Sequence, residues 1–219
     1  GRVTGMMFGP DGRLYACRRE PKQVVSWGMD GSEKIIAEGI DTNDLAVTAQ
    51  GEIYVTDPPG HRVWFIDKAG RKRVVAEGIE FPNGVILSPD QSLVVVADTR
   101  SKWVTSYQRS ADGSLVNGQP FYRMETPDEA SSALADGLTV DSLGYLYVAT
   151  SLGLQICDQP GRVVAIVNKP HAGALSNVTF GGPNLDTLYV TAGDKVFRRT
   201  IRRKGVTSDG VVKPPQPRL

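Results

Sequence analysis

The amino-acid sequence predicts an all-β fold of the propeller type, in which small four-stranded sheets repeat around a central axis. Glycine and proline are frequent along the whole chain, at 24 and 14 of 219 residues, so many short elements joined by turns are expected. Five segments share one pattern: a polar residue, an alternating apolar run, a turn, and a second run ending in Tyr-Val or its equivalent. Their repeat of about 40 residues is typical of a propeller blade, whereas a β-sandwich gives no reason for such a period.

The five repeat units follow one another from the N-terminus. Their first polar residues are Thr4, Asn43, Asn83, Asp136 and Ser176, at spacings of 39, 40, 53 and 40 residues. Each unit supplies two strands directly after this residue, and further strands come from the alternating runs at 22–31, 33–40, 61–70, 72–79, 102–113 and 118–125. Asp-Gly or Ala-Gly turns separate the runs, so each unit is expected to form four antiparallel strands, named a to d in chain order.

The third unit is longer than the others because of an insertion at residues 126–135. Thr126 is a suitable N-cap and Pro127 a suitable first helical residue, so one helical turn is predicted there. The chain is expected to form a single propeller domain over residues 1–205. A proline-rich, extended tail is expected over residues 206–219.

The composition argues against several classes of function. The 25 basic and 24 acidic residues give a formal net charge of +1, so nothing indicates a nucleic-acid or anionic-membrane partner. The longest apolar runs, residues 93–97 and 163–167, are far shorter than the ~20 residues of a membrane helix. Cys17 and Cys157 are too few for a disulfide scaffold, and the sequence assigns no cellular compartment.

The polar residues that open the five units are candidates for a functional site. Strand a of each blade lines the central channel of a propeller, so these side chains are expected at one mouth of that channel. The oxygen atoms of one Asp, two Asn and hydroxyl groups suit a hard cation such as calcium, and no His or Cys joins them, as zinc would favour. The alternative is a local role, because Asn or Asp followed by Gly also suits the turn into a strand.

The loops between strands b and c should border the same mouth, because strand b returns to it. They cover residues 18–20, 57–61, 98–101, 150–153 and 192–194. His61 and Arg100 in these loops are candidate substrate contacts. A single loop histidine is more often a solvated surface residue, and the same alternative holds for His171, which precedes the last strand a.

Four segments carry a resemblance to a known family. They are NDLAVTAQGEIYVTDPPG from Asn43, FPNGVILSPDQSLVVVADT from Phe81, ADGLTVDSLGYLYVATSLGLQI from Ala135 and LSNVTFGGPNLDTLYVTAG from Leu175. In order and motif they resemble the gluconolactonase/regucalcin (senescence marker protein) family of six-bladed propellers, over nearly all of residues 1–205. The resemblance is strongest to bacterial gluconolactonase-like members.

The resemblance implies a metal site and a reaction. By position, Asn83 and Asp136 would bind a divalent metal. Asn43 would lie beside the metal, as a substrate contact in the lactonases or as a ligand in the phosphotriesterase-like relatives. Asp136 would also act as the general base for water, while the metal polarises the lactone carbonyl and holds the developing oxyanion. Calcium is the expected ion, with magnesium, manganese and zinc as alternatives.

The sequence departs from this family in two respects. The family's remaining metal ligand, a Glu in a Glu-Gly-Pro context of the first blade, has no counterpart, so weaker calcium binding is expected. Thr4 aligns with the second blade, so we expect about five of six blades in this chain and a further blade upstream of Gly1 in the natural protein. In addition, Asp41 stands where regucalcin has an arginine that helps to hold the sugar acid.

The predicted function is metal-dependent hydrolysis of a small-molecule lactone of the sugar type. Two alternatives remain open. A non-catalytic propeller would bind a ligand or a protein at the same mouth, since propellers support many functions. A metal-dependent hydrolase of aryl or phosphate esters would use the same residues on a different substrate.

Overall fold

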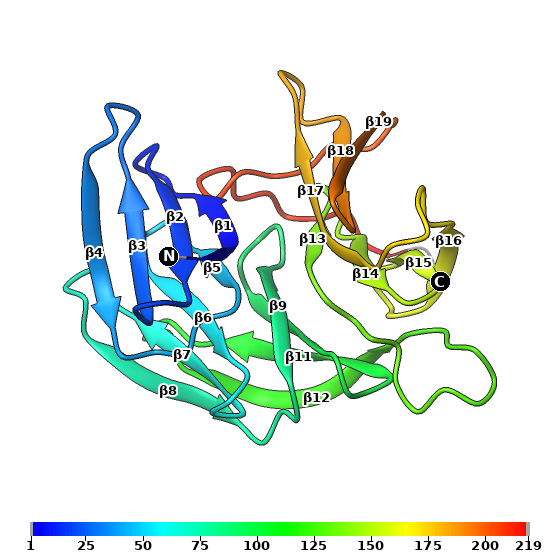
Figure 1. Cartoon of the computed structure of the whole chain (residues 1–219), viewed down its shortest axis with the longest axis horizontal. Helices are drawn as coiled ribbons and strands as arrows, with labels where there is room; N and C mark the ends of the chain where they lie inside the picture. Colours follow the sequence, from blue (N-terminus) through cyan, green and yellow to red (C-terminus); the bar gives the residue numbers. More distant parts are fainter. Residues whose placement is uncertain (1, 218–219) are drawn as a thin grey trace.

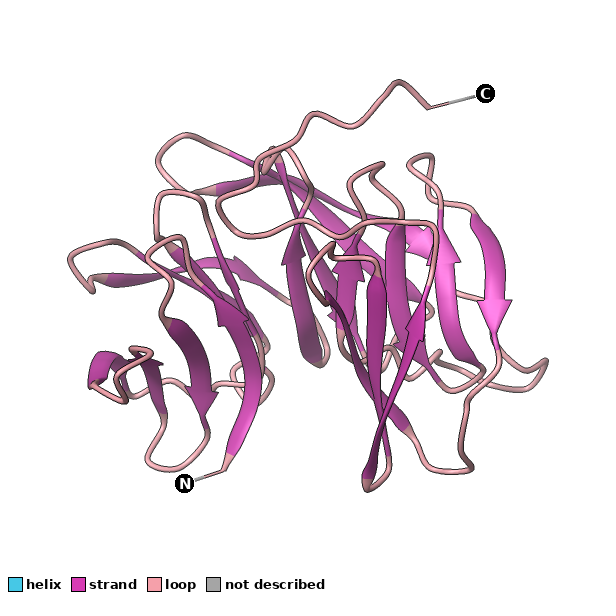
Figure 2. Ribbon diagram, turned by 90° about the horizontal axis from the view of Figure 1, so that it is seen from above, coloured by secondary structure: helices cyan, strands magenta, loops and turns pink. Residues whose placement is uncertain are grey.

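The computed structural model describes residues 2–217, which form five antiparallel sheets arranged as blades around a central channel (Figures 1 and 2). Blades 1 to 4 have four strands each, and blade 5 has three among the described residues. The strands are β1 Val3–Phe8, β2 Leu14–Arg18, β3 Gln23–Trp27, β4 Glu33–Glu38, β5 Leu45–Val47, β6 Ile53–Asp57, β7 Arg62–Ile66, β8 Lys72–Glu77, β9 Pro82–Leu87, β10 Leu93–Asp98, β11 Trp103–Arg109, β12 Leu115–Arg123, β13 Leu138–Val140, β14 Leu146–Thr150, β15 Gly153–Cys157, β16 Val163–Val167, β17 Leu175–Gly181, β18 Thr187–Ala192 and β19 Lys195–Thr200. The all-β class and the five repeat units are thus confirmed.

Apolar side chains between consecutive blades hold the structure together. Four buried clusters lie between blades 1 and 2, 2 and 3, 3 and 4, and 4 and 5. Successive side chains of a strand point to opposite faces of its sheet. In β10, Val94 and Val96 therefore pack toward blade 2, while Val95 and Ala97 pack toward blade 4. Burial on both faces explains why this strand is a continuous apolar run.

The ring of blades is open between blades 1 and 5. Figure 1 shows β1 and β17 on either side of this opening. Met6 and Phe8 of β1 are 59% and 56% exposed, and Val196 of β19 is 68% exposed. All three line one cavity, so two apolar sheet faces border it without being covered by residues 2–217.

The prediction of a helical turn at residues 126–135 is wrong. Residues 2–217 contain no helix, and hence none long and apolar enough to cross a membrane. One turn forms, in which the Ala130 N–H donates to the Pro127 carbonyl over 3.0 Å, but it does not continue. The chain instead turns inward, because Ala133 and Ala135 are buried in the cluster between blades 3 and 4.

The C-terminal segment crosses the end of the channel opposite the polar residues. Ser208 is 4% exposed. Its Oγ donates to the Phe8 carbonyl at the end of β1, and its own carbonyl accepts a bond from Gln91 Nε2, each over 2.8 Å. The segment predicted as an extended tail over residues 206–219 therefore packs against blades 1 and 3, while residues 218–219 lie outside the described part of the chain.

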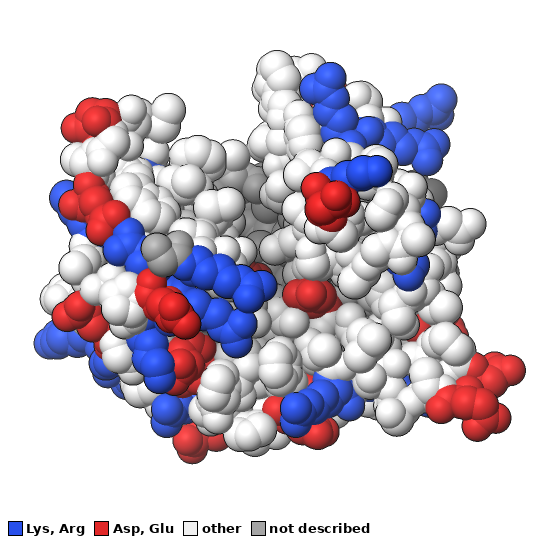
Figure 3. All heavy atoms as spheres, in the orientation of Figure 1, with Lys and Arg blue, Asp and Glu red and all other residues white. Residues whose placement is uncertain are grey.

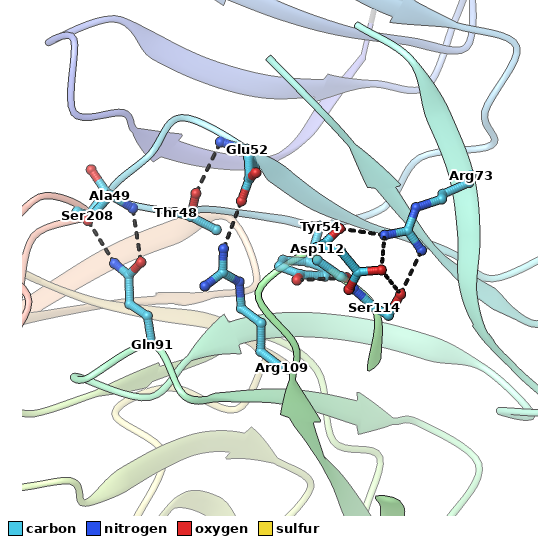
Figure 4. Close-up of polar contacts among 11 residues, drawn as sticks. Thr48, Ala49, Glu52, Tyr54, Arg73, Gln91, Arg109, Asp112, Ser114 and Ser208 are labelled. Carbon is cyan, nitrogen blue, oxygen red and sulfur yellow. Dashed lines mark hydrogen bonds and ion pairs between the residues drawn. The ribbon is translucent and has the colours of Figure 1, made fainter. Parts of the chain in front are cut away.

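Gln91 also joins blade 3 to blade 2, as Figure 4 shows. Its Oε1 accepts the Ala49 N–H over 2.9 Å, and its side chain is buried. Beside it, Arg109 Nη2 donates to Glu52 Oε2 over 2.7 Å, again between blades 3 and 2 (Figure 4). The Gln91 side chain thus forms hydrogen bonds both to blade 2 and to the C-terminal segment.

We expect Gln91→Ala to lower the free energy of unfolding by about 2 kcal/mol, because it leaves two backbone groups without their hydrogen-bond partner. Urea unfolding followed by tryptophan fluorescence measures the change. Gln108→Ala is the matched control, because the Gln108 side chain is exposed and accepts a hydrogen bond from Asn117 on its own hairpin. Equal losses in the two variants would contradict this stabilising role of the Gln91 side chain.

Candidate functional site

The five polar residues that open the repeat units line one cavity of about 870 Å³ at the axis of the propeller. They are Thr4, Asn43, Asn83, Asp136 and Ser176. Each lies at or just before the start of an inner strand, so all five lie at the same end of the channel. The structure therefore brings together the ring of residues that the sequence repeat singles out.

Glycines directly after three of these residues let the inner strands approach one another. A Cβ on Gly5 would lie 2.1 Å from Asp44 Oδ1, and one on Gly84 would lie 2.5 Å from the Asp136 carbonyl oxygen. A Cβ on Gly137 would lie 2.1 Å from the Asn177 side chain. None of the three has a positive φ. These glycines therefore serve close packing at the axis, not the turn chemistry that was the alternative explanation for them.

Asn83 is held in a fixed orientation at the start of β9. Its Nδ2 donates to Thr99 Oγ1 over 2.9 Å, and this hydroxyl in turn donates to the Ala135 carbonyl over 2.7 Å. Its backbone carbonyl accepts a bond from Thr56 Oγ1 over 2.6 Å. With the amide nitrogen engaged by Thr99, the Oδ1 atom of Asn83 is available to a ligand in the cavity.

Asp136 carries a carboxyl group that is partly buried next to Asn83. Burial raises the pKa of this group to about 6, while hydrogen bonds from the Asn83 side chain and the Gly137 N–H oppose the shift. The Asp136 N–H donates to the Ala149 carbonyl over 3.0 Å, which fixes the backbone at this point. Asp136 is thus a carboxyl group that titrates near neutral pH.

Asp44 is a second acidic group at the axis, and sequence reasoning missed it. Burial raises the pKa of Asp44 to about 7, the nearby Asp136 charge adds to the shift, and the N–H groups of Leu45 and Val85 oppose it. The Val85 bond to Oδ2 measures 3.2 Å. The signal was present in the repeat, because three other units have glycine where the second unit has Asp44.

Of the three residues predicted to contact the substrate, one lines the cavity and two do not. Asn43 lines the cavity, and its backbone carbonyl accepts a bond from Thr4 Oγ1. His61 and Arg100 are exposed and do not line it. His61 Nδ1 lies 2.7 Å from the Glu80 carbonyl oxygen, and the Arg100 guanidinium lies over the Phe81 ring at 5.5 Å.

Two other arginines, Arg2 and Arg19, line the cavity in blade 1. They are joined through the backbone, since the Arg19 N–H donates to the Arg2 carbonyl over 2.9 Å. Figure 3 shows basic side chains over the start of β1 beside the central hollow, and acidic atoms within the hollow. The mouth therefore combines a basic border with a partly acidic interior.

The donor atoms of the cavity suit an oxygen-preferring cation. Asn83 offers an amide oxygen and Asp136 a carboxylate, which are ligands that calcium and magnesium take. Within residues 2–217, no group of three or more His, Cys, Asp or Glu is arranged to hold a metal. The residues therefore fit a hard cation held by a mixed amide and carboxylate set, with few charged ligands.

Comparison with known proteins gives a family match over most of the chain. The sequence model described as the SMP-30/gluconolactonase/LRE-like region matches residues 1–194. The gluconolactonase of Zymomonas mobilis is 24% identical over 221 residues, which cover 89% of this chain and 62% of that protein. This chain therefore spans less than two thirds of the length of that relative.

Two solved structures are similar in fold. A gluconolactonase from Xanthomonas campestris has a TM-score of 0.78 at 25% identity, with 90% of this chain and 71% of that one covered. Regucalcin from Agrobacterium tumefaciens, a calcium-binding protein, has a TM-score of 0.70 at 16% identity, with 94% and 92% covered. The likeness to regucalcin, at this identity, shows the fold alone.

In the presence of a chelator, we expect the free energy of unfolding to fall as the pH rises from 5 to 8. The pKa of Asp44 is about 7 in the fold against 3.8 for the free group, so the folded state binds this proton more tightly. The resulting stabilisation is complete below pH ~3.8 and is lost as the pH rises through the folded pKa, with a loss of about 2–3 kcal/mol between pH 5 and 8.

Urea unfolding at several pH values tests this expectation in the wild type and in Asp44→Asn, which keeps a side-chain acceptor for the Val85 N–H. The variant should show a shallower pH dependence. Asp30→Asn is the control, because the Asp30 carboxyl is exposed and its pKa is lowered by hydrogen bonds with Ser32. A wild-type slope in Asp44→Asn would contradict the assignment of the titrating group.

Proposed function

The chain belongs to the SMP-30/gluconolactonase/LRE-like family, and from this premise we propose that it hydrolyses lactones of sugar acids at the mouth of its channel. The observation that carries the proposal is one cavity containing a carboxyl group with a pKa near neutrality, Asp136, beside the oriented amide of Asn83. The gluconolactonases among its relatives support the choice of a lactone as substrate.

Asp136 is proposed as the general base. A pKa of about 6 leaves this carboxyl mostly ionised at pH 7 and still basic enough to accept a proton, which is the range that suits a general base. It takes a proton from water as the water oxygen bonds to the lactone carbonyl carbon. The ring C–O bond then breaks, and the departing alkoxide takes up a proton to give the hydroxy acid.

Asn83 and Asp136 are proposed to hold a divalent cation, with calcium favoured by their oxygen donors. A bound cation would supply positive charge beside the substrate carbonyl. Asn43, which lines the same cavity, is proposed to orient the substrate by hydrogen bonding.

A second candidate is a propeller that binds a ligand at this mouth without catalysis. The scarcity of acidic metal-binding clusters in residues 2–217 favours it, because few charged ligands predict weak cation binding. Hydrolysis assays separate the two functions. A panel that includes aryl and phosphate esters also tests the third function that the sequence left open.

Calcium is expected to raise the thermal stability of the protein. A ligand at 100 times its dissociation constant stabilises a fold by about 2.7 kcal/mol, which a thermal melt resolves. The melt should shift upward between EDTA and rising calcium in the wild type and stay fixed in Asp136→Asn. An equal shift in both proteins would contradict Asp136 as a ligand.

Asp136→Asn should keep the fold and reduce lactone hydrolysis at least 100-fold, as loss of a general base does. A pH-indicator assay with glucono-1,5-lactone measures the rate, and circular dichroism verifies the fold. Asp128→Asn, in the exposed insertion, is the matched control and should retain wild-type activity. Near-wild-type hydrolysis in Asp136→Asn would rule out its role as base.

A further inference from the structure

The arginines at the cavity border differ from most of the other arginines in their surroundings. Of the thirteen other arginines in the described part of the chain, eight have a guanidinium nitrogen within 4.0 Å of a carboxylate oxygen: Arg18, Arg62, Arg71, Arg73, Arg100, Arg109, Arg162 and Arg203. Arg2 and Arg19 pair with no acidic residue in the described part of the chain, and neither is stacked on an aromatic ring there. Their positive charges are therefore not compensated by an ion pair within residues 2–217.

These two side chains lie at the same end of the channel as the proposed catalytic residues. Arg2 is two residues before Thr4, whose Oγ1 bonds to the Asn43 carbonyl. The Arg19 N–H bonds to the Arg2 carbonyl, which ties the b–c loop of blade 1 to the start of β1. One cavity is lined by Arg2, Arg19, Asn43 and Asp136, so the arginines and the carboxyl group border the same space.

Among the residues that the structure describes, the other blades contribute no arginine or lysine to the cavity lining. Arg100, in the b–c loop of blade 3, lies over Phe81 with its Nη1 3.8 Å from Glu80 Oε1, outside the cavity lining. In blade 5, Ser176 and Thr191 present hydroxyl groups 2.8 Å apart. A bound molecule would therefore meet positive charge on the blade 1 side and neutral polar groups on the blade 5 side.

We propose that the lactone carries an anionic oxyacid group, which Arg19 and Arg2 bind at the blade 1 side of the cavity. The proposal rests on the proposed function and names its class of substrate. A guanidinium group binds a carboxylate or a phosphate through two parallel hydrogen bonds, and such charge-assisted bonds are stronger than neutral ones. A neutral sugar lactone would leave these two guanidinium groups without such a partner.

The test compares lactones that differ in charge. The substrates are neutral glucono-1,5-lactone, its 6-phosphate, and glucaro-1,4-lactone, which bears a carboxylate. The wild type should show higher kcat/KM for at least one anionic lactone than for the neutral one, and the two anionic substrates distinguish phosphate from carboxylate. Arg19→Ala should lower kcat/KM for that substrate about 10- to 100-fold and change the neutral reaction less than threefold.

Arg123→Ala is the matched control, because Arg123 is exposed on the outer strand of blade 3 and is not part of the cavity lining. It should leave both reactions unchanged. Hydrolysis of the neutral lactone with no preference for the anionic ones, or equal losses with all substrates in Arg19→Ala, would overturn the anion site while the lactonase function stands.

A binding measurement separates failure of the site from failure of the function. Calorimetry uses gluconate, glucarate and 6-phosphogluconate, which are inert to hydrolysis. Glucarate or 6-phosphogluconate, which carry an additional carboxylate or phosphate, should bind more tightly than gluconate, and this difference should be lost in Arg19→Ala. This result would support the anion site even if no lactone is hydrolysed. A lack of hydrolysis would overturn the lactonase function alone. Equal binding of the three acids, together with no anionic preference in the assay, would overturn the anion site.

Discussion

Contact between inner strands at the propeller axis is the constraint on which the site depends. The inner strands of consecutive blades lie so close that Gly5, Gly84 and Gly137 have no room for a side chain. At this spacing the residue before each glycine is carried to the edge of the same cavity. The clusters between blades fix the distance, because blades 2, 3 and 4 each pack both of their faces against neighbours. The packing of the blades therefore also determines where the polar residues that open the repeat units lie.

The same packing explains the electrostatics of the mouth. Close approach of the blades removes water from the carboxyl groups of Asp44 and Asp136, and burial is the largest cause of the raised pKa of each. Neither group has an ion-pair partner among residues 2–217, although N–H groups donate to both. A cation entering the cavity would favour the ionised forms, so its binding is linked to release of protons.

The sequence predicted the blades and the ring well, because both follow from a period of about 40 residues. It predicted the loops poorly. His61 has a φ of 54° and turns to the Glu80 carbonyl, and Arg100 lies over Phe81, so neither reaches the cavity. A loop side chain takes its direction from local turns and neighbours that no repeat pattern contains. The helical turn predicted at 126–135 does not form either, because the chain turns inward to bury Ala133, which is a tertiary effect.

The fold alone does not require the two acidic groups at the axis, and their presence is therefore an argument for a functional role. Glycine occupies the position of Asp44 in three other blades, so the fold accommodates a residue without a carboxyl group there. At neutral pH the raised pKa values mean that ionising Asp44 and Asp136 works against folding. Carboxyl groups in a cavity whose pKa values are raised toward 7, at the expense of folding stability, are characteristic of sites that bind ions or transfer protons. The raised pKa values of Asp44 and Asp136 therefore support the proposal that chemistry takes place at this mouth, because packing alone does not require two carboxyl groups there.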